Sequence, residues 1–310
     1  MSDLEYITNS NVPWECFENK TFFVTGATGL LGGILIKSLL AKNKKIRIIA
    51  LARRPATIES KDLSFIYGDV TEKLKIDEPI DYIVHGANPT ASKEFINHPV
   101  EIIKTIYEGT LNTLELAKEK SVKGYLYLSS MEVYTDMNTT SVRSCYPEGK
   151  RLAENLCASY FYEYKVNAKI ARLAQTFGAS IDIEHDNRVF AQFARCAKEK
   201  RDIVLRTKAD TMRSYCYTTD AITAMLWILA KGKSGEFYDV ASKVPPASIH
   251  DMAKCFGKVV FDIAESAEKL GYPPAKEIIL DTAKLESLGW EADKSIEKGG
   301  IKEMCRRVME

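Results

Sequence analysis

The chain has 310 residues, of which 45% are hydrophobic and 27% are charged, and its formal net charge is +1. This balance is typical of a globular protein with one large or two smaller domains, and it favours neither nucleic acid nor a membrane surface as a partner. No apolar run approaches the ~20 residues of a membrane span, and the N-terminus lacks a signal-peptide pattern. The seven cysteines have no metal-like spacing, so we expect reduced thiols, no metal site and a cytoplasmic location.

A glycine-rich turn between a strand and a helix is the first recognisable unit. Residues 21–24 are apolar and rich in aromatic and β-branched side chains, which predicts a strand. The turn TGATGLLG follows, then an apolar helix over residues 30–41 and a second strand over residues 46–51. In such a unit the glycines permit a tight turn, close approach of a pyrophosphate and close helix packing, and the helix N-terminus attracts the phosphates. This predicts a dinucleotide site on Gly26, Thr28, Gly29, Leu30, Leu31 and Gly32.

The spacing of these glycines, T-G-x-x-G-x-x-G, resembles the extended branch of the short-chain dehydrogenase/reductase family. In NAD-preferring sites an acidic residue near the end of the second strand accepts the ribose hydroxyls, whereas an arginine suits a 2′-phosphate. Here Ala52 stands in the place of the acid, and Arg53 and Arg54 follow it. We therefore expect NADP or NAD as the cofactor, with NADP favoured. The alternative is that both arginines are only solvated.

A third strand over residues 65–70 ends at Asp69 and Val70, which are candidates for cofactor binding. In the resembled family the matching acid lies beside the adenine ring. Asp69 is also suited to a local turn or a helix cap, because Asp before Val-Thr is a common signal for either.

The fourth strand and its turn, residues 81–88, supply the next candidates. The resemblance implies that Ala87 lets the backbone pass close to the cofactor, and that Asn88 contacts the substrate. His85 lies in this strand, and we expect it to be a structural residue rather than a catalytic base.

A fifth strand over residues 122–128 leads to Ser130 at its carboxyl end, where open α/β sheets bind ligands. Tyr146 and Lys150 follow, one helical turn apart, before a helix over residues 151–164. A lysine ammonium beside a phenol lowers the pKa of the phenol, so Tyr146 becomes a usable acid or base. We expect Lys150 also to bind the cofactor ribose, and Ser130 to hold the reacting substrate oxygen.

The segments SSMEVY, CYPEGKRLAENL and RLAQTFG narrow the resemblance to the nucleotide-sugar epimerase/dehydratase family, in a pattern similar to that of UDP-glucuronate decarboxylases. On this match Ser130, Glu132, Tyr146 and Lys150 are the catalytic residues. Met131 is a departure at a substrate-binding position, since 4,6-dehydratases have an acid there and decarboxylases a serine. Ile106 is another, since relatives have an asparagine that supports the lysine.

The resemblance implies that the second half of the chain binds the nucleotide sugar. Gln175 stands where relatives have an asparagine that touches the phosphate. A polar loop over residues 180–187 and a helix over residues 188–199, beginning with Arg188, follow it. Arg213 would pair with the substrate diphosphate, because a guanidinium fits a phosphate; alternatively, it forms a structural ion pair.

These observations predict an α/β protein with a Rossmann-type, doubly wound parallel sheet and a smaller C-terminal substrate-binding region. We expect residues 1–178, with about 213–242, to form the cofactor domain and residues 179–310 the substrate region. The expected function is oxidation of a nucleoside-diphosphate sugar at a carbon such as C4, then epimerisation or decarboxylation, in surface-polysaccharide or related sugar biosynthesis. The alternatives are an NADPH-dependent ketoreductase and a non-catalytic cofactor sensor. The resemblance further implies a homodimer.

Overall fold

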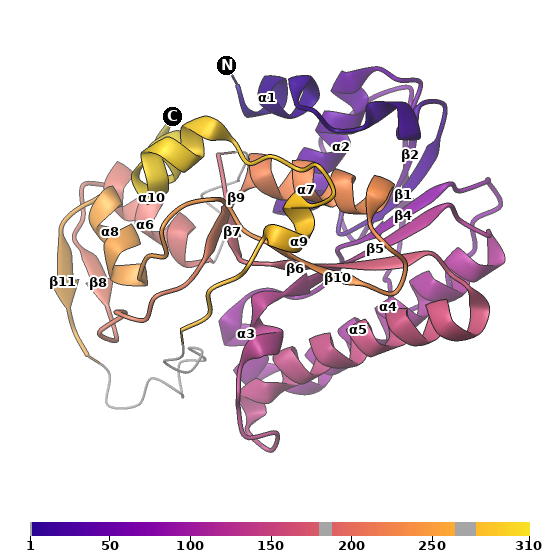
Figure 1. The fold of residues 1–310 in the computed structure, drawn as a ribbon. Coiled ribbons are helices and arrows are strands. Elements are labelled where there is room, and N and C mark those ends of the chain that lie inside the picture. The colour runs from indigo at the N-terminus through magenta and orange to yellow at the C-terminus, as the bar shows by residue number, and fades with distance from the viewer. Residues whose placement is uncertain (1, 180–187, 264–276) are drawn as a thin grey trace.

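The computed structural model describes residues 2–179, 188–263 and 277–310, and its centre is a seven-stranded, wholly parallel sheet (Figure 1). The strand order is β10-β6-β5-β4-β1-β2-β3. The strands are β1 (Thr21–Thr25), β2 (Arg47–Ala52), β3 (Leu63–Tyr67), β4 (Tyr82–His85), β5 (Gly124–Ser130), β6 (Ala168–Leu173) and β10 (Phe237–Val240). The order reverses between β1 and β4, and such a switch point is where open α/β sheets bind their ligands.

Helices cover both faces of this sheet, which is why its strands are almost continuously apolar (Figure 1). One face is covered by α2 (Leu30–Lys42) and α7 (Thr218–Lys231), with α1 (Asp3–Asn9) packed on both helices. The other face is covered by α4 (Pro99–Glu119) and α5 (Cys145–Tyr164), with the short α3 (Ser92–Asn97) before them. Each face has its own apolar core. The predicted doubly wound α/β fold is confirmed.

A third apolar core joins the elements of the C-terminal region. Its helices are α6 (Val189–Lys198), α8 (Ile249–Phe256) and α10 (Lys294–Met309), and α9 (Ala283–Glu286) lies against β10. Two small parallel sheets pair β7 (Gln175–Phe177) with β9 (Tyr215–Tyr217), and β8 (Ile203–Leu205) with β11 (Val259–Phe261). Short 3₁₀ turns are η1 (Trp14–Phe17), η2 (Met131–Tyr134) and η3 (Val142–Ser144). The division of the chain near residue 178 stays a prediction.

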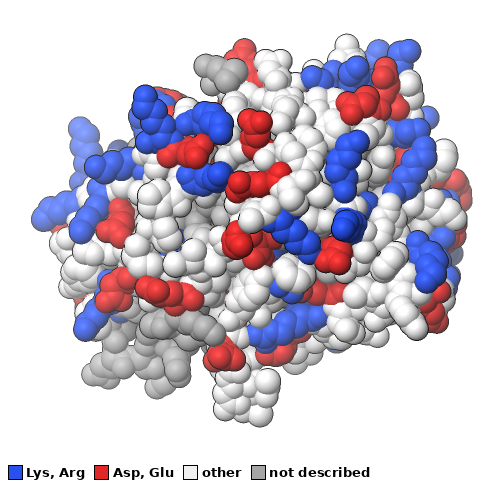
Figure 2. All heavy atoms as spheres, viewed as in Figure 1, with Lys and Arg blue, Asp and Glu red and all other residues white. Residues whose placement is uncertain are grey.

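Acidic and basic side chains are interspersed on the face seen in Figure 2, without a large area of one sign. Among the described residues there is no helix with the length and apolar character needed to cross a membrane.

Two predicted elements have different bounds in the structure. Helix α5 begins at Cys145 rather than at residue 151, because Pro147 falls in its first turn, where a missing N–H breaks no helical hydrogen bond. Strand β3 ends at Tyr67, and Asp69 lies beyond it in a local turn. The predicted loop over residues 180–187 lies outside the described residues.

Candidate active site

The glycine turn joins β1 to α2 at the switch point of the sheet. Gly26 has a φ of +71°, and a Cβ there would lie 2.6 Å from the carbonyl group of Gly86. A Cβ on Gly32 would lie 2.2 Å from the carbonyl oxygen of Gly26. Helix α2 begins after Gly29, with no side-chain cap and no acidic residue in its first turn. The turn therefore fits the diphosphate of a dinucleotide, because helical N–H groups and the positive helix end are available to it.

The other predicted cofactor residues surround this turn. Thr28 is exposed, and Leu30 and Leu31 are half-buried in the first turn of α2. Arg53 and Arg54 are both exposed just after β2. Neither arginine has an ion pair with another described residue, so both are accessible to a ligand.

Asp69 and Val70 have clear local contacts. The Asp69 carboxylate accepts hydrogen bonds from the Thr71 backbone N–H at 3.0 Å and from the Thr71 hydroxyl at 2.9 Å. This is the turn conformation that the sequence offered as the alternative to adenine binding, although Asp69 remains half-buried rather than enclosed. Val70 is buried against Gly109, where an added Cβ would lie 2.8 Å from its side chain.

His85 is the last residue of β4, the strand that neighbours β1 at the switch point. Its Nδ1 lies 2.7 Å from the Thr25 hydroxyl, which also accepts hydrogen bonds of 3.2 Å from the N–H groups of Gly86 and Ala87. With its acceptor positions used, the hydroxyl donates to Nδ1, so the His85 proton is on Nε2. Burial lowers the pKa of His85 to about 3, which leaves it neutral and structural. Both amide atoms of the neighbouring Asn88 are buried without a hydrogen-bond partner in the described part of the chain.

Ser130, Tyr146 and Lys150 come together between the end of β5 and the start of α5. Tyr146 is buried beside Ser130, whose hydroxyl lowers the pKa of the phenol. Lys150 is also buried, and its Nζ donates a 2.7 Å hydrogen bond to the carbonyl oxygen of Leu128. Burial lowers the pKa of Lys150 to about 7, and the charge of Glu154 opposes this shift.

The expected effect of Lys150 on Tyr146 is absent from this arrangement. Burial and the nearby Glu132 carboxylate raise the pKa of Tyr146, while the hydrogen bond with Ser130 and the charge of Arg143 lower it less strongly. The Lys150 Nζ lies 5.7 Å from the centroid of the Tyr146 ring and is bonded to the backbone of β5 instead. The sequence placed the two residues on one helix face but did not show where the ammonium points.

Arg143 is the residue of this site that the sequence analysis missed. Its Nη2 donates to both carboxylate oxygens of Glu132, at 2.9 and 2.6 Å, and its side chain is only 4% exposed. Its guanidinium also lies 4.8 Å from the Phe95 ring centroid, and that ring stacks on the Tyr146 ring at 4.3 Å. The only signal in the sequence was a basic residue three positions before Tyr146. Glu132 is thus held in a buried ion pair beside the tyrosine.

Apolar side chains occupy two positions where relatives were expected to have polar ones. Met131 is 2% exposed and joins the apolar core beneath α2 and α7. Ile106 is fully buried and packs on Gly149, where an added Cβ would lie 3.0 Å from its Cδ1. Neither residue supplies a proton donor.

The predicted substrate residues of the second half lie at different depths. Arg213 is buried; burial lowers its pKa, and the charge of Glu132 raises it, so the two are within electrostatic reach. The Gln175 side-chain oxygen is buried with no hydrogen-bond partner among the described residues. Arg188 occupies the N-cap position of α6, and its guanidinium lies 5.1 Å from the Phe190 ring centroid.

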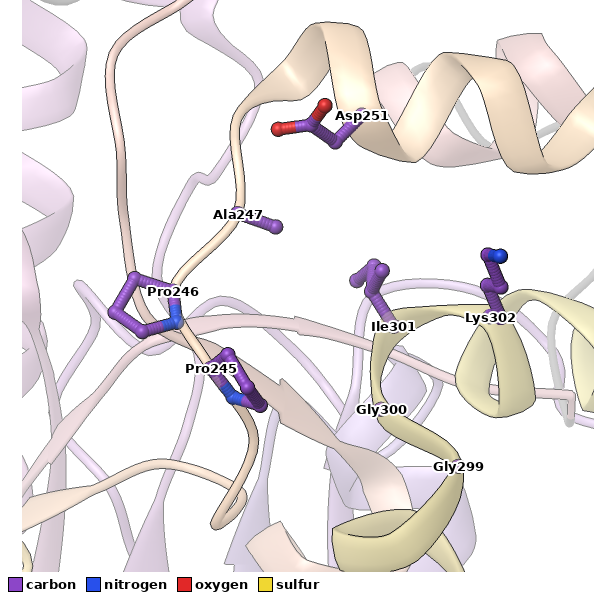
Figure 3. A pocket seen from close by; sticks show the side chains of 8 residues that line it. All are labelled: Pro245, Pro246, Ala247, Asp251, Gly299, Gly300, Ile301 and Lys302. Carbon is purple, nitrogen blue, oxygen red and sulfur yellow. The ribbon is translucent and has the colours of Figure 1, made fainter.

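A separate hollow of about 320 Å³ lies in the C-terminal region (Figure 3). It opens where Gly300, with a φ of +62°, interrupts α10 opposite the start of α8. Its lining residues are Pro245, Pro246, Ala247, Asp251, Gly299, Gly300, Ile301 and Lys302. None of them belongs to the predicted active site.

Comparison with known proteins identifies the family of this chain. The model of the NAD dependent epimerase/dehydratase family matches residues 22–241. UDP-glucuronic acid decarboxylase 5 of Arabidopsis thaliana is 30% identical over 240 residues, which are 71% of this chain and 69% of that protein. UDP-glucuronic acid decarboxylase 1 of Xenopus tropicalis is 26% identical, over 91% of this chain and 70% of that protein.

Solved structures share the fold at lower identity. An epimerase from Methanothermobacter thermautotrophicus has a TM-score of 0.80 and 18% identity, over 98% of this chain and 94% of that one. The dTDP-glucose 4,6-dehydratase DesIV of Streptomyces venezuelae, solved with NAD bound, has a TM-score of 0.77 and 20% identity, over 92% of this chain and 96% of that one. The match over most of the chain sets aside the non-catalytic alternative: the protein is an extended short-chain dehydrogenase/reductase and an enzyme of the NAD-dependent epimerase/dehydratase family.

Proposed function

We propose that this enzyme oxidises a nucleoside-diphosphate sugar at C4 and then decarboxylates or epimerises it, in the biosynthesis of surface polysaccharides or related sugars. The observation that carries the proposal is the grouping of Ser130, Tyr146 and Lys150 at the carboxyl end of β5, beside the Glu132–Arg143 ion pair. Its sequence relatives that are named as UDP-glucuronic acid decarboxylases also support it.

In this reaction Ser130 would hold the C4 hydroxyl, and Tyr146 would remove its proton. Tyr146 must first lose its own proton, and the Ser130 hydrogen bond and the Arg143 charge favour that loss against burial. The glycine turn and the first turn of α2 would hold a nicotinamide dinucleotide, whose oxidised form would supply a hydride acceptor and a positive charge at this site. Lys150, in its protonated and positively charged form, would bind the cofactor ribose.

The step after oxidation depends on the sugar. If C6 is a carboxylate, the C4 ketone makes the sugar a β-keto acid, which loses carbon dioxide and takes a proton at C5. If C6 is a hydroxymethyl group, return of the hydride to the other face of C4 gives the epimer. Loss of the C6 hydroxyl as water needs an acid at the leaving oxygen, and Met131 cannot supply one. We therefore expect no 4,6-dehydration.

The test is to incubate the protein with UDP-glucuronate, UDP-glucose, UDP-GlcNAc and dTDP-glucose, each with NAD and with NADP. Mass spectrometry would follow loss of carbon dioxide or water, and chromatography would detect a new epimer of unchanged mass. Decarboxylation or epimerisation at ordinary enzymatic rates supports the proposal. A 4-keto-6-deoxy product would contradict the interpretation of Met131, and no turnover of any of the four sugars would contradict the proposal.

A second candidate is an NADPH-dependent ketoreductase of nucleotide sugars, and the exposed pair Arg53 and Arg54 favours it. Charge-assisted hydrogen bonds from these arginines to a 2′-phosphate would strengthen NADP binding by at least about tenfold over NAD. We predict this preference, and its loss in the Arg53→Ala/Arg54→Ala variant. Calorimetric titration with both cofactors measures it, and Lys61→Ala, which alters another exposed cation near β3, is the control. Equal affinities in the unmodified protein, or tighter binding of NAD, would rule out NADP preference.

A further inference from the structure

Two consecutive residues at the end of β5 are each held by one turn of α5. Lys150 donates to the carbonyl oxygen of Leu128 at 2.7 Å. One turn further along α5, the Glu154 carboxylate accepts a 2.5 Å hydrogen bond from the Ser129 hydroxyl. The next residue of the strand is Ser130, so these two bonds set its position relative to Tyr146.

Glu154 also forms an ion pair with a residue of a third element, strand β6. The Arg172 guanidinium on β6 donates to both Glu154 oxygens, with a shortest distance of 2.6 Å, in a pair whose side chains are 14% and 9% exposed. Arg172 also donates to the Tyr134 hydroxyl at 2.7 Å, and that hydroxyl donates to Asp239 on β10 at 3.0 Å. The carboxylate therefore has a fixed place in a network across β5, β6 and β10.

We propose that Glu154 is a positioning residue for the reaction: it fixes the Ser130 end of β5 against α5 and supplies the negative charge that keeps Lys150 protonated. This inference rests on the proposed function, in which Lys150 acts as a cation and Ser130 holds the reacting oxygen. Tyr146, Lys150 and Glu154 recur every four residues on one face of α5, so the carboxylate follows the lysine on the face that holds both catalytic side chains.

Among the described residues that face Lys150, Glu154 is the one that carries a negative charge. Groups facing Lys150 are His85 on β4, Tyr127 on β5, and Tyr146, Glu154 and Cys157 on α5. His85 is neutral, and burial raises the pKa values of Tyr127, Tyr146 and Cys157, so these four carry no charge near neutral pH. Groups facing Glu154 are Ser129, Arg172, Tyr127 and Asp239, together with Lys150 and Cys157 on its own helix.

Two substitutions separate the charge from the hydrogen bond. Glu154→Gln keeps an oxygen that can accept from Ser129 but removes the charge, whereas Ser129→Ala removes the hydrogen bond and keeps the charge. In the pH profile of kcat/KM, we expect Glu154→Gln to move the high-pH limb down by about one pH unit, because Lys150 then loses its proton more easily. We expect Ser129→Ala to lower kcat and leave the limb in place. Glu163→Gln, at an exposed position of the same helix, should change neither quantity.

A second readout needs no substrate. Because the pKa of Lys150 is lower in the folded chain, its charge opposes folding below about pH 7, and the effect fades as the pH rises toward the unfolded value of 10.5. A stabilising Glu154–Lys150 interaction therefore exists only below about pH 7. Urea unfolding of the unmodified protein, Glu154→Gln, Lys150→Met and the double variant would measure the coupling at about pH 5.5 and about pH 8.5.

We expect coupling at the lower pH and none at the higher pH. Coupling that is absent at the lower pH, or equal at both, would overturn the proposal, and so would an unmoved limb in the Glu154→Gln profile. If the unmodified protein turns over no nucleotide sugar, the proposed function fails, and the unfolding cycle alone decides the role of Glu154.

Discussion

Tyr146 has a buried phenol beside Ser130, so removing the phenol hydroxyl tests the chemistry at a single atom. We predict that Tyr146→Phe lowers kcat by at least ~10²-fold, which is the usual contribution of a positioned acid or base. Cofactor affinity should be nearly unchanged, because the glycine turn is untouched. Steady-state kinetics and calorimetric cofactor titration measure the two effects. Tyr162→Phe, at an exposed position of the same helix, is the matched control, and normal turnover of Tyr146→Phe would remove this residue from the mechanism.

The Glu132–Arg143 pair allows a test of stability at the same site. Breaking a buried ion pair by removing one partner costs ~3–5 kcal/mol. Because the Glu132 side chain is 16% exposed, we predict a loss at the lower end, about 3 kcal/mol, for Arg143→Gln. The double variant Glu132→Gln/Arg143→Gln should recover much of the stability lost in Arg143→Gln, because no unpaired charge then remains. Urea unfolding at neutral pH measures both, and a double variant no more stable than Arg143→Gln would show that the ion pair is not the cause.

At the scale of elements, two adjacent glycines of α2 differ in how closely they pack: Gly32 is in close contact with the glycine turn, and Gly33 is not. A Cβ on Gly32 would lie 2.2 Å from the Gly26 carbonyl oxygen, whereas a Cβ on Gly33 would lie an ordinary 3.7 Å from that of Ala27. We predict that Gly32→Ala displaces α2 from the turn, weakens cofactor binding and lowers Tm. Gly33→Ala should be tolerated or stabilise the helix by up to ~1 kcal/mol, because alanine is the better helix former.

Each variant adds one methyl group, and the two positions are adjacent in the chain. Thermal unfolding compares their Tm values, and titration compares their cofactor affinities. If both variants bind cofactor equally well, the close contact of Gly32 does not hold the turn.

The elements also show how far the sequence could predict this protein. The glycine turn and the apolar runs were sufficient for the parallel sheet, because both depend on local composition and spacing. The predicted start of α5 was wrong. Proline usually ends a helix, but Pro147 lies in the first turn of α5, where proline is tolerated. Arg143 was missed because it lies 11 residues from its partner Glu132, a separation that matches neither helix nor strand spacing, and only the fold of the intervening segment brings the two charges together. Pairings of this kind have no periodic signal in a single sequence.

At the scale of the whole molecule, the helices α4 and α5 lie side by side on the outer face of the sheet (Figure 1). Val100, Ile103 and Tyr107 are 61%, 43% and 39% exposed on α4, at the spacing of one helix face, and Leu152 is 42% exposed on α5. Exposed apolar side chains of this kind mark interaction surfaces. A second copy, related by a twofold axis, would cover the same side chains on both subunits.

A homodimer was expected from the sequence, and we now predict that its subunits meet through α4 and α5. Ile103→Glu/Tyr107→Glu should give a monomer, because two carboxylates on each subunit would then meet in an apolar contact. Sedimentation velocity at micromolar concentration measures the change, and Val204→Glu, at an exposed apolar position on β8, should leave the dimer intact. Both substituted side chains are exposed, so a folded monomer that still binds cofactor is the expected product. A monomeric unmodified protein, or an unchanged dimer in the double variant, would show that this helix pair is not the subunit contact.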